Sequence, residues 1–380
     1  MMGNAMDNAT GNAMDNTMDN TMDNATGNAM DNTMDNATSS TFRQIVADSP
    51  KNAVIYTRFD IGATLASGQT FAFREDGGGF WGIVDGRPVR IKKPGGEGEG
   101  AGGEGEGAGA DGSAYEIICR EDDACFWRNY FDLESSYDLL LKDFIYNDDR
   151  RDGAAADAHD DAASGSRDDA ASDVRDDAAS DVRDAGKAFL SACVKAFGGL
   201  RLLRQPVWES VCAFIISANN NIKRIESIYM RLSERYGDAL TWAGHNFCRF
   251  PTPRQLAAAD VQSLQAAGLG YRAPYIFETA NVIHKYGLPD LDALDYDRAL
   301  KELQKLKGVG EKVADCVLLF STRHRIAFPV DVWMERVLNM HYGMDGTRAQ
   351  IKRNAQALFG DAAGVAQQFL FHGMRTNLKI

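Results

Sequence analysis

The chain has 380 residues, a formal net charge of −13 and six cysteines, and 44% of its residues are hydrophobic. This length is enough for two ordinary domains. Without a secretion signal or an apolar run of roughly 18 residues, the sequence predicts neither export nor a membrane-spanning helix, so we expect a cytoplasmic protein, or a nuclear one in a nucleated cell.

The negative charge is concentrated in low-complexity segments. Residues 1–40 repeat Met-Asp-Asn units and hold six Asp but no Lys or Arg. Acidic, low-complexity runs also occupy residues 94–114 and 147–186. Because such segments lack the apolar residues of a core, we predict that 1–40 and 147–186 are disordered and that 94–114 is a flexible loop. Residues 187–380 hold 25 Lys or Arg against 17 Asp or Glu, which favours an anionic partner.

Between these segments, residues 41–146 have the pattern of a small antiparallel sheet domain. Short runs of aromatic and β-branched residues are bounded by Gly or Asp-Gly turns, as is typical of strands. The predicted strands are Ala53–Tyr56, Thr70–Phe73, Phe80–Val84, Val89–Ile91 and Tyr115–Ile118. A helix over Tyr137–Tyr146 is expected to leave the sheet.

Residues 187–380 are predicted to be helical almost throughout. The fold class is therefore α+β, with the small sheet domain followed by a bundle of about ten helices. Apolar residues recur with the helical period in the segments Val207–Ser217, Ile222–Tyr236, Val261–Ala267, Pro274–Tyr286, Tyr296–Leu306, Glu311–Ser321, Asp331–Tyr342, Arg348–Phe359 and Ala362–Arg375. Glycines stand at or just past most of the expected ends, where helix C-caps favour them.

The turn Leu306-Lys-Gly-Val-Gly310 separates two of these helices and predicts a helix hairpin. Amides at the start of a helix bind anions, typically phosphate, because the first donors are unpaired and the helix dipole is positive there. Lys312 lies in the first turn of the second helix, Cys316 one turn further on the same face, and Asp331 opens the next helix. A lysine facing a carboxylate has the ingredients of an amine nucleophile with a base. Taken alone, Lys312 is more simply interpreted as a surface lysine and Asp331 as a helix N-cap. Their combination with the turn favours a catalytic role.

Two further motifs carry polar side chains on expected loops. One is Ser217-Ala-Asn219-Asn-Asn-Ile-Lys-Arg224, and the other is Gly268-Leu-Gly-Tyr271-Arg272. Amide side chains followed by cations suit a loop that contacts base edges and phosphates in a groove, although consecutive asparagines also form ordinary turns and caps. The alternative to a DNA contact is that Tyr271 is a half-buried tyrosine of the core. On the last helix, Gln367 and Phe371 are spaced i, i+4, which places an amide beside an aromatic face.

These motifs together resemble the helix-hairpin-helix and Gly/Pro-Asp core of the DNA glycosylase superfamily, and Lys312 with Cys316 makes them most similar to 8-oxoguanine DNA glycosylase. The resemblance implies removal of 8-oxoguanine opposite cytosine. Lys312 would attack C1′ and form a Schiff base that permits β-elimination, while Asp331 would assist deprotonation and steady the cationic sugar.

The same resemblance implies the remaining site residues. The base pocket would consist of Gly68, whose carbonyl bonds the N7–H of the lesion, with Cys316, Gln367 and Phe371. The implied DNA contacts are Asn219, Arg224, Tyr271, Arg272, Gly308, Val309, Gly310 and Trp333. Trp333 stands where many members of the family have His.

The resemblance further implies a monomer that acts on damaged double-stranded DNA and requires no cofactor, with a monovalent or calcium ion on the carbonyls of Leu306 and Val309. One alternative is a glycosylase for alkylated bases, which shares the fold and the aspartate but lacks the lysine. Another is a non-catalytic, structure-specific DNA-binding protein that uses the hairpin only to grip phosphate. An iron–sulfur glycosylase is disfavoured because no cysteine follows Cys316.

Overall fold

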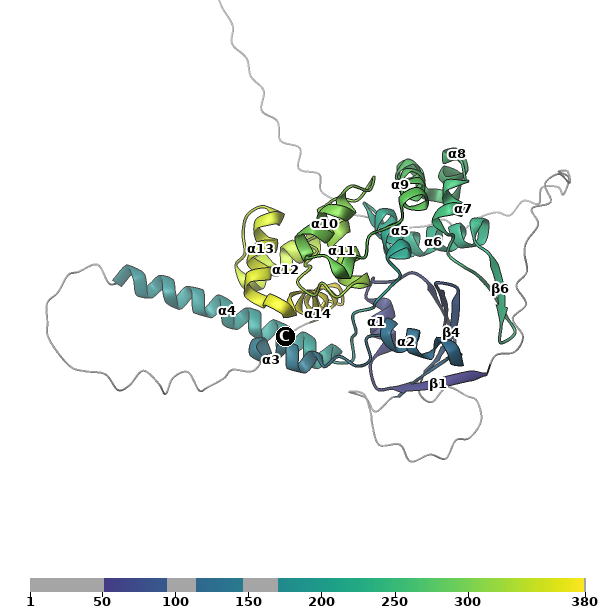
Figure 1. Cartoon of the computed structure of the whole chain (residues 1–380). Coiled ribbons are helices and arrows are strands. Elements are labelled where there is room, and N and C mark those ends of the chain that lie inside the picture. Colours follow the sequence, from purple (N-terminus) through teal and green to yellow (C-terminus); the bar gives the residue numbers. More distant parts are fainter. Residues whose placement is uncertain (1–50, 94–113, 146–169, 379–380) are drawn as a thin grey trace, which may run out of the picture. The chain divides into compact units, whose positions relative to one another are not determined.

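The computed structural model describes residues 51–93, 114–145 and 170–378, and Figure 1 shows how their helices and strands are arranged. The predicted disorder of residues 1–40 lies outside the described residues. So do all but the last residue of the insert 94–114, and residues 147–169 of the second acidic insert. The described elements belong to one unit, residues 42–380. The predicted domain boundaries remain a prediction.

A five-stranded antiparallel sheet confirms the predicted fold of the first part. Its strands are β1 (Asn52–Thr57), β2 (Phe73–Asp76), β3 (Gly79–Val84), β4 (Arg87–Lys92) and β5 (Tyr115–Arg120), in the order β1-β5-β4-β3-β2. Two short helices, α1 (Ile61–Ala66) and α2 (Ala124–Tyr130), accompany it. Alternate side chains of β4 and β5, among them Val89, Ile91, Ile117 and Cys119, are buried and form its core face.

The strand predicted over Thr70–Phe73 is wrong in its bounds, because β2 begins only at Phe73. The preceding Gln69 is buried and bonded to the helical part of the chain. Its side chain donates to the Arg201 carbonyl at 2.8 Å and accepts from the Leu203 amide at 2.9 Å, and its own carbonyl accepts from the Gln205 side chain at 2.7 Å. Since Gln69 gives its carbonyl to a side chain rather than to a strand, the segment stays irregular.

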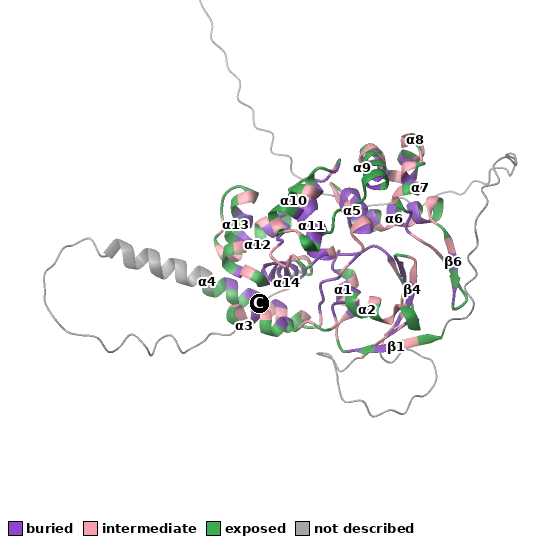
Figure 2. Ribbon diagram, in the orientation of Figure 1, coloured by how far each residue is buried: buried purple, intermediate pink, exposed green. Residues whose placement is uncertain are grey.

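The remainder is mainly helical, as predicted. Its helices are α3 (Tyr137–Ile145), α4 (Ala170–Phe197), α5 (Val207–Ser217), α6 (Ile222–Tyr236), α7 (Pro253–Ala257), α8 (Val261–Leu264), α9 (Ala273–Tyr286), α10 (Tyr296–Gln304), α11 (Glu311–Ser321), α12 (Val332–Tyr342), α13 (Arg348–Phe359) and α14 (Ala363–Arg375). Helices α5 and α11 pack together and are buried along most of their length (Figure 2). None of the described helices has the length and apolar character needed to cross a membrane.

A small hairpin interrupts the region predicted to be helical almost throughout. Strands β6 (Ala239–Trp242) and β7 (His245–Cys248) are joined by Ala243 and Gly244, which both have positive φ, at 49° and 77°. Two left-handed residues match the twist of paired strands in a two-residue turn. The hairpin packs on the sheet, where the ring centroids of Trp81 and His245 lie 3.7 Å apart.

The prediction of a disordered insert over 147–186 is wrong for residues 170–186, which form the first part of α4. The end of α4 is anchored because the helix packs on α12 and α14. The segment before it is rich in alanine, the strongest helix former. Since extending an existing helix avoids the cost of nucleation, the anchored end allows the alanine-rich segment to continue as helix.

Glu209 of α5 makes two hydrogen bonds, one to the turn between β3 and β4 and one to α6. It accepts from the Asp85 amide at 2.8 Å and from the Tyr229 hydroxyl at 2.9 Å. Burial raises the pKa of the Glu209 carboxyl from 4.5 to about 7, because the ionised form is disfavoured there. The folded state therefore binds a proton more tightly than the unfolded one. The contribution of Glu209 to the free energy of unfolding is fully present below pH 4.5 and is lost as the pH rises through about 7.

We expect Glu209→Gln to remove this pH dependence. The amide keeps an acceptor for the Asp85 amide but does not ionise. Relative to the wild type, the free energy of unfolding of the variant should improve by about 3 kcal/mol between pH 4.5 and pH 8. Urea unfolding at both pH values measures this, with Glu278→Gln on the exposed face of α9 as control. Parallel pH profiles for wild type and Glu209→Gln would contradict the assignment.

Candidate active site

The turn between α10 and α11 requires glycine at position 308. Gly308 has φ +81°, and a Cβ there would lie 2.8 to 2.9 Å from Tyr275. The Thr279 hydroxyl donates to the Lys307 carbonyl at 3.0 Å and fixes the turn. Gly310 is the N-cap of α11 and offers no side-chain acceptor to the first amides of the helix. Those amides are available to an anion, as the sequence predicts.

Lys312 points its ammonium into the interior beside α5, with Nζ 5.7 Å from the centroid of Phe214. Burial disfavours the ammonium form, but Cys316 and Asp331 favour it, and the balance raises the pKa of Lys312. Burial also raises the pKa of the Cys316 thiol to about 11. Near neutral pH the lysine is therefore protonated, and it must lose a proton before it can attack.

Asp331 is the N-cap of α12, which confirms the structural role considered from the sequence. Its Oδ1 accepts from the amides of Trp333 and Met334, both at 3.0 Å. These bonds hold the carboxylate in one orientation. Since the same carboxylate raises the pKa of Lys312, capping and an electrostatic role coexist in Asp331.

One cavity of about 50 Å³ brings the predicted catalytic and base-pocket residues together. Lys312, Asp331, Gly68, Cys316, Gln367 and Phe371 all line it, with Ser67, Phe214, Phe320, Pro329 and Gln368. Because a water molecule occupies about 30 Å³ in the liquid, the space is far too small for a purine. Side chains must therefore move before the cavity can accept a base.

Gln367 carries an unsatisfied polar atom in this cavity. Its side chain is 4% exposed, and its Nε2 donates to the Pro329 carbonyl at 3.4 Å. Its Oε1 is buried without a hydrogen-bond partner. Leaving a buried acceptor unpaired costs about 1–3 kcal/mol. The orientation of Gln367 is explained if a ligand donates a hydrogen bond to this oxygen.

Gly68 is held at the cavity by the bonds of its neighbour Gln69. It has φ +81°, and a Cβ there would lie 3.3 Å from the Arg375 guanidinium and 3.4 Å from Ile222. Glycine alone adopts this conformation without strain. The backbone of the segment can therefore approach a ligand more closely than any other residue would allow.

Tyr271 joins the asparagine loop to the helix hairpin, so that most of the predicted DNA-binding residues lie together. The Tyr271 hydroxyl donates to the Ala218 carbonyl, next to Asn219, at 3.2 Å. The Tyr271 ring lies 6.2 Å from that of Tyr275, the residue against which Gly308 packs. Tyr271 is 52% exposed, so it is a surface residue and not part of the core. The asparagine loop, Tyr271 and the hairpin thus form one surface.

Arg272 differs from the expectation of a side chain that reads a base. It is 3% exposed, and its guanidinium donates to the carbonyls of Ala218 and Asn219, the latter at 3.0 Å. It also lies over the Tyr271 ring, 4.3 Å from the centroid. With these bonds formed, Arg272 positions the asparagine loop. Asn219 in this loop has a left-handed backbone, with φ +48°. A contact with cytosine would require these bonds to open and stays a prediction.

Arg224 and Trp333 lie on the surface, outside the base cavity. Arg224 is exposed in the first turn of α6, where its amide donates to Asn221 Oδ1 at 2.9 Å. Asn221 therefore has the capping role that consecutive asparagines also predicted. Trp333 is 44% exposed, with the Arg336 guanidinium 5.6 Å from its ring centroid.

Sequence reasoning missed two residues beside the base cavity. Phe214 lies on α5, which is apolar around most of its surface, so no periodicity distinguishes it. Arg375 follows Phe371 by one turn on α14, and this i, i+4 spacing could have identified it. Its Nη1 is buried without a hydrogen-bond partner and lies close to Gly68.

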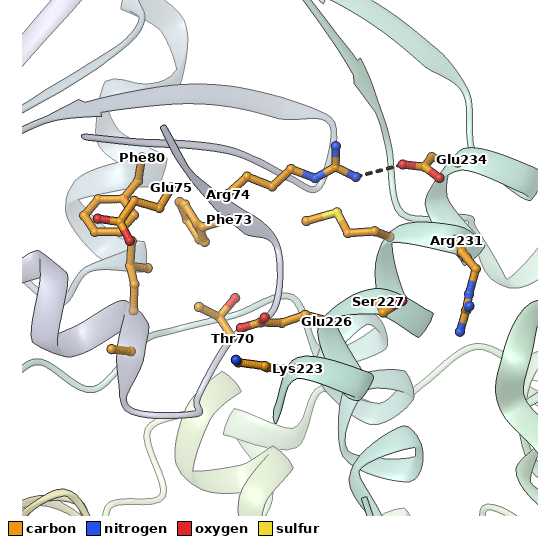
Figure 3. A pocket seen from close by; sticks show the side chains of 13 residues that line it. Thr70, Phe73, Arg74, Glu75, Phe80, Lys223, Glu226, Ser227, Arg231 and Glu234 are labelled. Carbon is orange, nitrogen blue, oxygen red and sulfur yellow. Dashed lines mark hydrogen bonds and ion pairs between the residues drawn. The ribbon is translucent and has the colours of Figure 1, made fainter. Parts of the chain in front are cut away.

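A much larger cavity, with a volume of about 700 Å³, lies elsewhere, between the sheet and α6 (Figure 3). Its walls include Phe73, Lys223 and Glu226. The Arg74–Glu234 ion pair, at 2.7 Å, spans it from β2 to α6. None of the residues predicted to act on DNA lines this cavity.

Comparisons with known proteins agree with this geometry. Residues 53–211 match the family model of the 8-oxoguanine DNA glycosylase N-terminal domain, and residues 212–360 match that of the HhH-GPD superfamily base excision DNA repair proteins. A probable N-glycosylase/DNA lyase of Methanothermobacter thermautotrophicus is 35% identical over 50% of this chain and 68% of its own length. The N-glycosylase/DNA lyase of Saccharomyces cerevisiae is 32% identical, over 40% of this chain and 45% of its own.

A solved structure of similar fold is the 8-oxoguanine glycosylase/lyase of Clostridium acetobutylicum, in complex with double-stranded DNA containing cytosine opposite 8-oxoguanine. It is 26% identical in sequence, with a TM-score of 0.65. The match covers 87% of this chain and 98% of that one. The likeness thus extends over both the sheet and the helical part.

Proposed function

The chain belongs to the 8-oxoguanine DNA glycosylase/lyase family of the HhH-GPD superfamily of base excision DNA repair proteins, and we propose that Lys312 is its nucleophile. It is a DNA glycosylase and abasic-site lyase that removes 8-oxoguanine. The observation that carries the proposal is the shared cavity, in which Lys312 and Asp331 meet Cys316 and Gln367. The lysine distinguishes this site from that of an alkylated-base glycosylase.

In the proposed reaction, the neutral amine of Lys312 attacks C1′ of the damaged nucleotide. The bond between C1′ and the base breaks, its electron pair leaves with the base, and the base takes up a proton. The nitrogen–C1′ bond then becomes a protonated Schiff base as the sugar ring opens. Loss of a C2′ proton expels the 3′ phosphate and nicks the strand. Asp331 would steady the positive charge that develops on the sugar.

Lesion recognition is proposed to rest on hydrogen bonds that normal guanine cannot make. Oxidation at C8 converts N7 from an acceptor to an N–H donor, which the carbonyl of Gly68 would accept. Gln367 would accept from the Watson–Crick edge, and Phe371 would stack on the base with Cys316 on the opposite face. A site built on such hydrogen bonds discriminates more strongly than shape alone. The base must first be flipped out of the duplex.

We propose that the surface formed by Asn219, Arg224, Tyr271 and Arg272 reads the opposite strand and prefers cytosine. The chain would act as a monomer, and Gly308–Gly310 would bind phosphate. The Leu306 carbonyl accepts the Val309 amide at 3.2 Å. A carbonyl has two lone pairs, so it could still bind a cation that strengthens the phosphate contact. The chemistry proposed for Lys312 involves no redox cofactor.

Borohydride trapping on duplexes with 8-oxoguanine opposite each of the four bases tests this function. We expect a covalent adduct with the wild type, formed fastest opposite cytosine, because only cytosine presents two adjacent acceptors on its Watson–Crick edge, O2 and N3, to the arginine donors of the surface that reads the opposite strand. A duplex with unmodified guanine is the control and should give no adduct. Binding to DNA without any adduct would instead support a non-catalytic DNA-binding protein. Equal rates opposite all four bases would overturn the cytosine preference.

A further inference from the structure

Lys312 borders a second cavity that the proposed reaction does not use. This cavity has a volume of about 140 Å³. Its walls are formed by Glu311, Lys312, Asp315, Val330, Arg348, Ala349 and Lys352. The nucleophile therefore stands between the base cavity and a space lined by charged side chains of α11 and α13.

Lys352 is the centre of this charged group. Its Nζ lies 2.8 Å from Glu311 Oε1 and 2.7 Å from Asp315 Oδ2. The Tyr296 hydroxyl of α10 donates to Asp315 Oδ1 at 2.5 Å. The side chains of Lys352 and Asp315 are only 7% and 1% exposed. Three helices thus converge on a buried ion pair, one turn from Lys312.

Stability alone does not account for this arrangement. Buried ion pairs are often no better than well-packed apolar side chains, because desolvation offsets their attraction. Burial raises the pKa of the Asp315 carboxyl, and Lys352 opposes that rise. Burial lowers the pKa of Lys352, but Asp315 and Glu311 outweigh it and raise the pKa. Lys352 therefore remains protonated near neutral pH, and its ammonium favours the ionised form of Asp315.

Several charges face Lys312 from different elements. On α11 these are Glu311 and Asp315, with the thiol of Cys316; Asp331 lies at the start of α12. The positive groups are Lys352 and Arg348 of α13. Without Lys352, Asp315 would keep the hydrogen bond from Tyr296 but lose its cation. The ammonium of Lys312 borders the same cavity, and Asp315 already favours it electrostatically.

We propose that Lys352 is a positioning residue for the nucleophile: by pairing with Asp315 and Glu311, it prevents these carboxylates from capturing the ammonium of Lys312. Lys312 then stays directed at the base cavity and gives up its proton more readily. This inference rests on the proposed role of Lys312 as the attacking amine. It assigns the charged group on α11 and α13 a part in the reaction, although none of it lines the base cavity apart from Lys312.

Cyanoborohydride trapping on a duplex with a preformed abasic site, followed from neutral to alkaline pH, tests the inference because imine formation requires the free amine. Lys352→Met should move the midpoint of the profile to higher pH by about 0.5 to 1 unit, since an unpaired carboxylate favours the ammonium. Asp315→Asn should move the midpoint by a similar amount in the opposite direction. Lys352→Arg keeps the charge and should match the wild type.

A purely structural role would reduce the amount of adduct without moving the midpoints in opposite directions. Unchanged midpoints, or shifts of Lys352→Met and Asp315→Asn in the same direction, would overturn the inference. If Lys352→Met does not fold, Asp315→Asn alone tests the inference, because an unchanged midpoint in that variant would overturn it. Absence of any adduct with the wild type would instead refute the proposed function.

Discussion

Lys312→Gln is expected to abolish adduct formation and strand nicking, with a loss of at least about a thousandfold. Gln has a side chain of similar length but no basic nitrogen, so neither attack on C1′ nor a Schiff base is available to it. The variant should fold, because the burial cost of the ammonium is removed together with its attraction to Cys316 and Asp331. Trapping and nicking assays on duplexes containing 8-oxoguanine measure the effect.

Two controls make this result specific to the side chain. Lys301→Gln removes an exposed lysine of α10, the other helix of the hairpin, and should leave trapping unchanged. Binding of Lys312→Gln to duplex DNA should persist, because the hairpin amides and the reading surface are intact. An adduct at the wild-type rate would show that another amine is the nucleophile and would remove the basis of the mechanism.

The parts of the site that the sequence predicts correctly depend on short, regular spacing. Gly308 and Gly310 mark a turn between two helical patterns, and Cys316 follows Lys312 by four residues. Gln367 and Phe371 show the same spacing on α14. Because α-helical geometry places such residues on one face, their proximity follows from the sequence. The extent of the shared cavity needs the fold, since Gly68 comes from the irregular segment before β2.

What the sequence could not predict depends on contacts between distant segments. Tyr296, Asp315 and Lys352 lie on three helices, and no spacing rule joins them. Arg272 is of the residue type expected to contact a base, yet its guanidinium is buried and donates to the carbonyls of Ala218 and Asn219. The first part of α4 follows from packing further along the helix, whereas its own composition indicates solvation. In each case tertiary contacts override a local pattern.

Asp331→Asn is expected to reduce excision of 8-oxoguanine by about a hundredfold to a thousandfold while leaving stability nearly unchanged. Asn caps helices about as well as Asp, so it can still accept from the amides of Trp333 and Met334. The lost charge would no longer steady the cationic sugar. Single-turnover excision and urea unfolding of the same variant separate the two roles.

The companion variant Asp331→Ala should lose the cap as well as the charge, at an additional cost of about 1 kcal/mol in the free energy of unfolding. Asp295→Asn is the matched control, because Asp295 caps α10 in the same way but lies outside the base cavity; its activity should equal that of the wild type. Asp331 also raises the pKa of Lys312, so Asp331→Asn should shift trapping on a preformed abasic site to lower pH. Excision, which creates charge on the sugar, should therefore suffer more than abasic-site trapping. Equal losses in both assays, accompanied by lower stability, would show that Asp331 acts through the position of α12 and not through its charge.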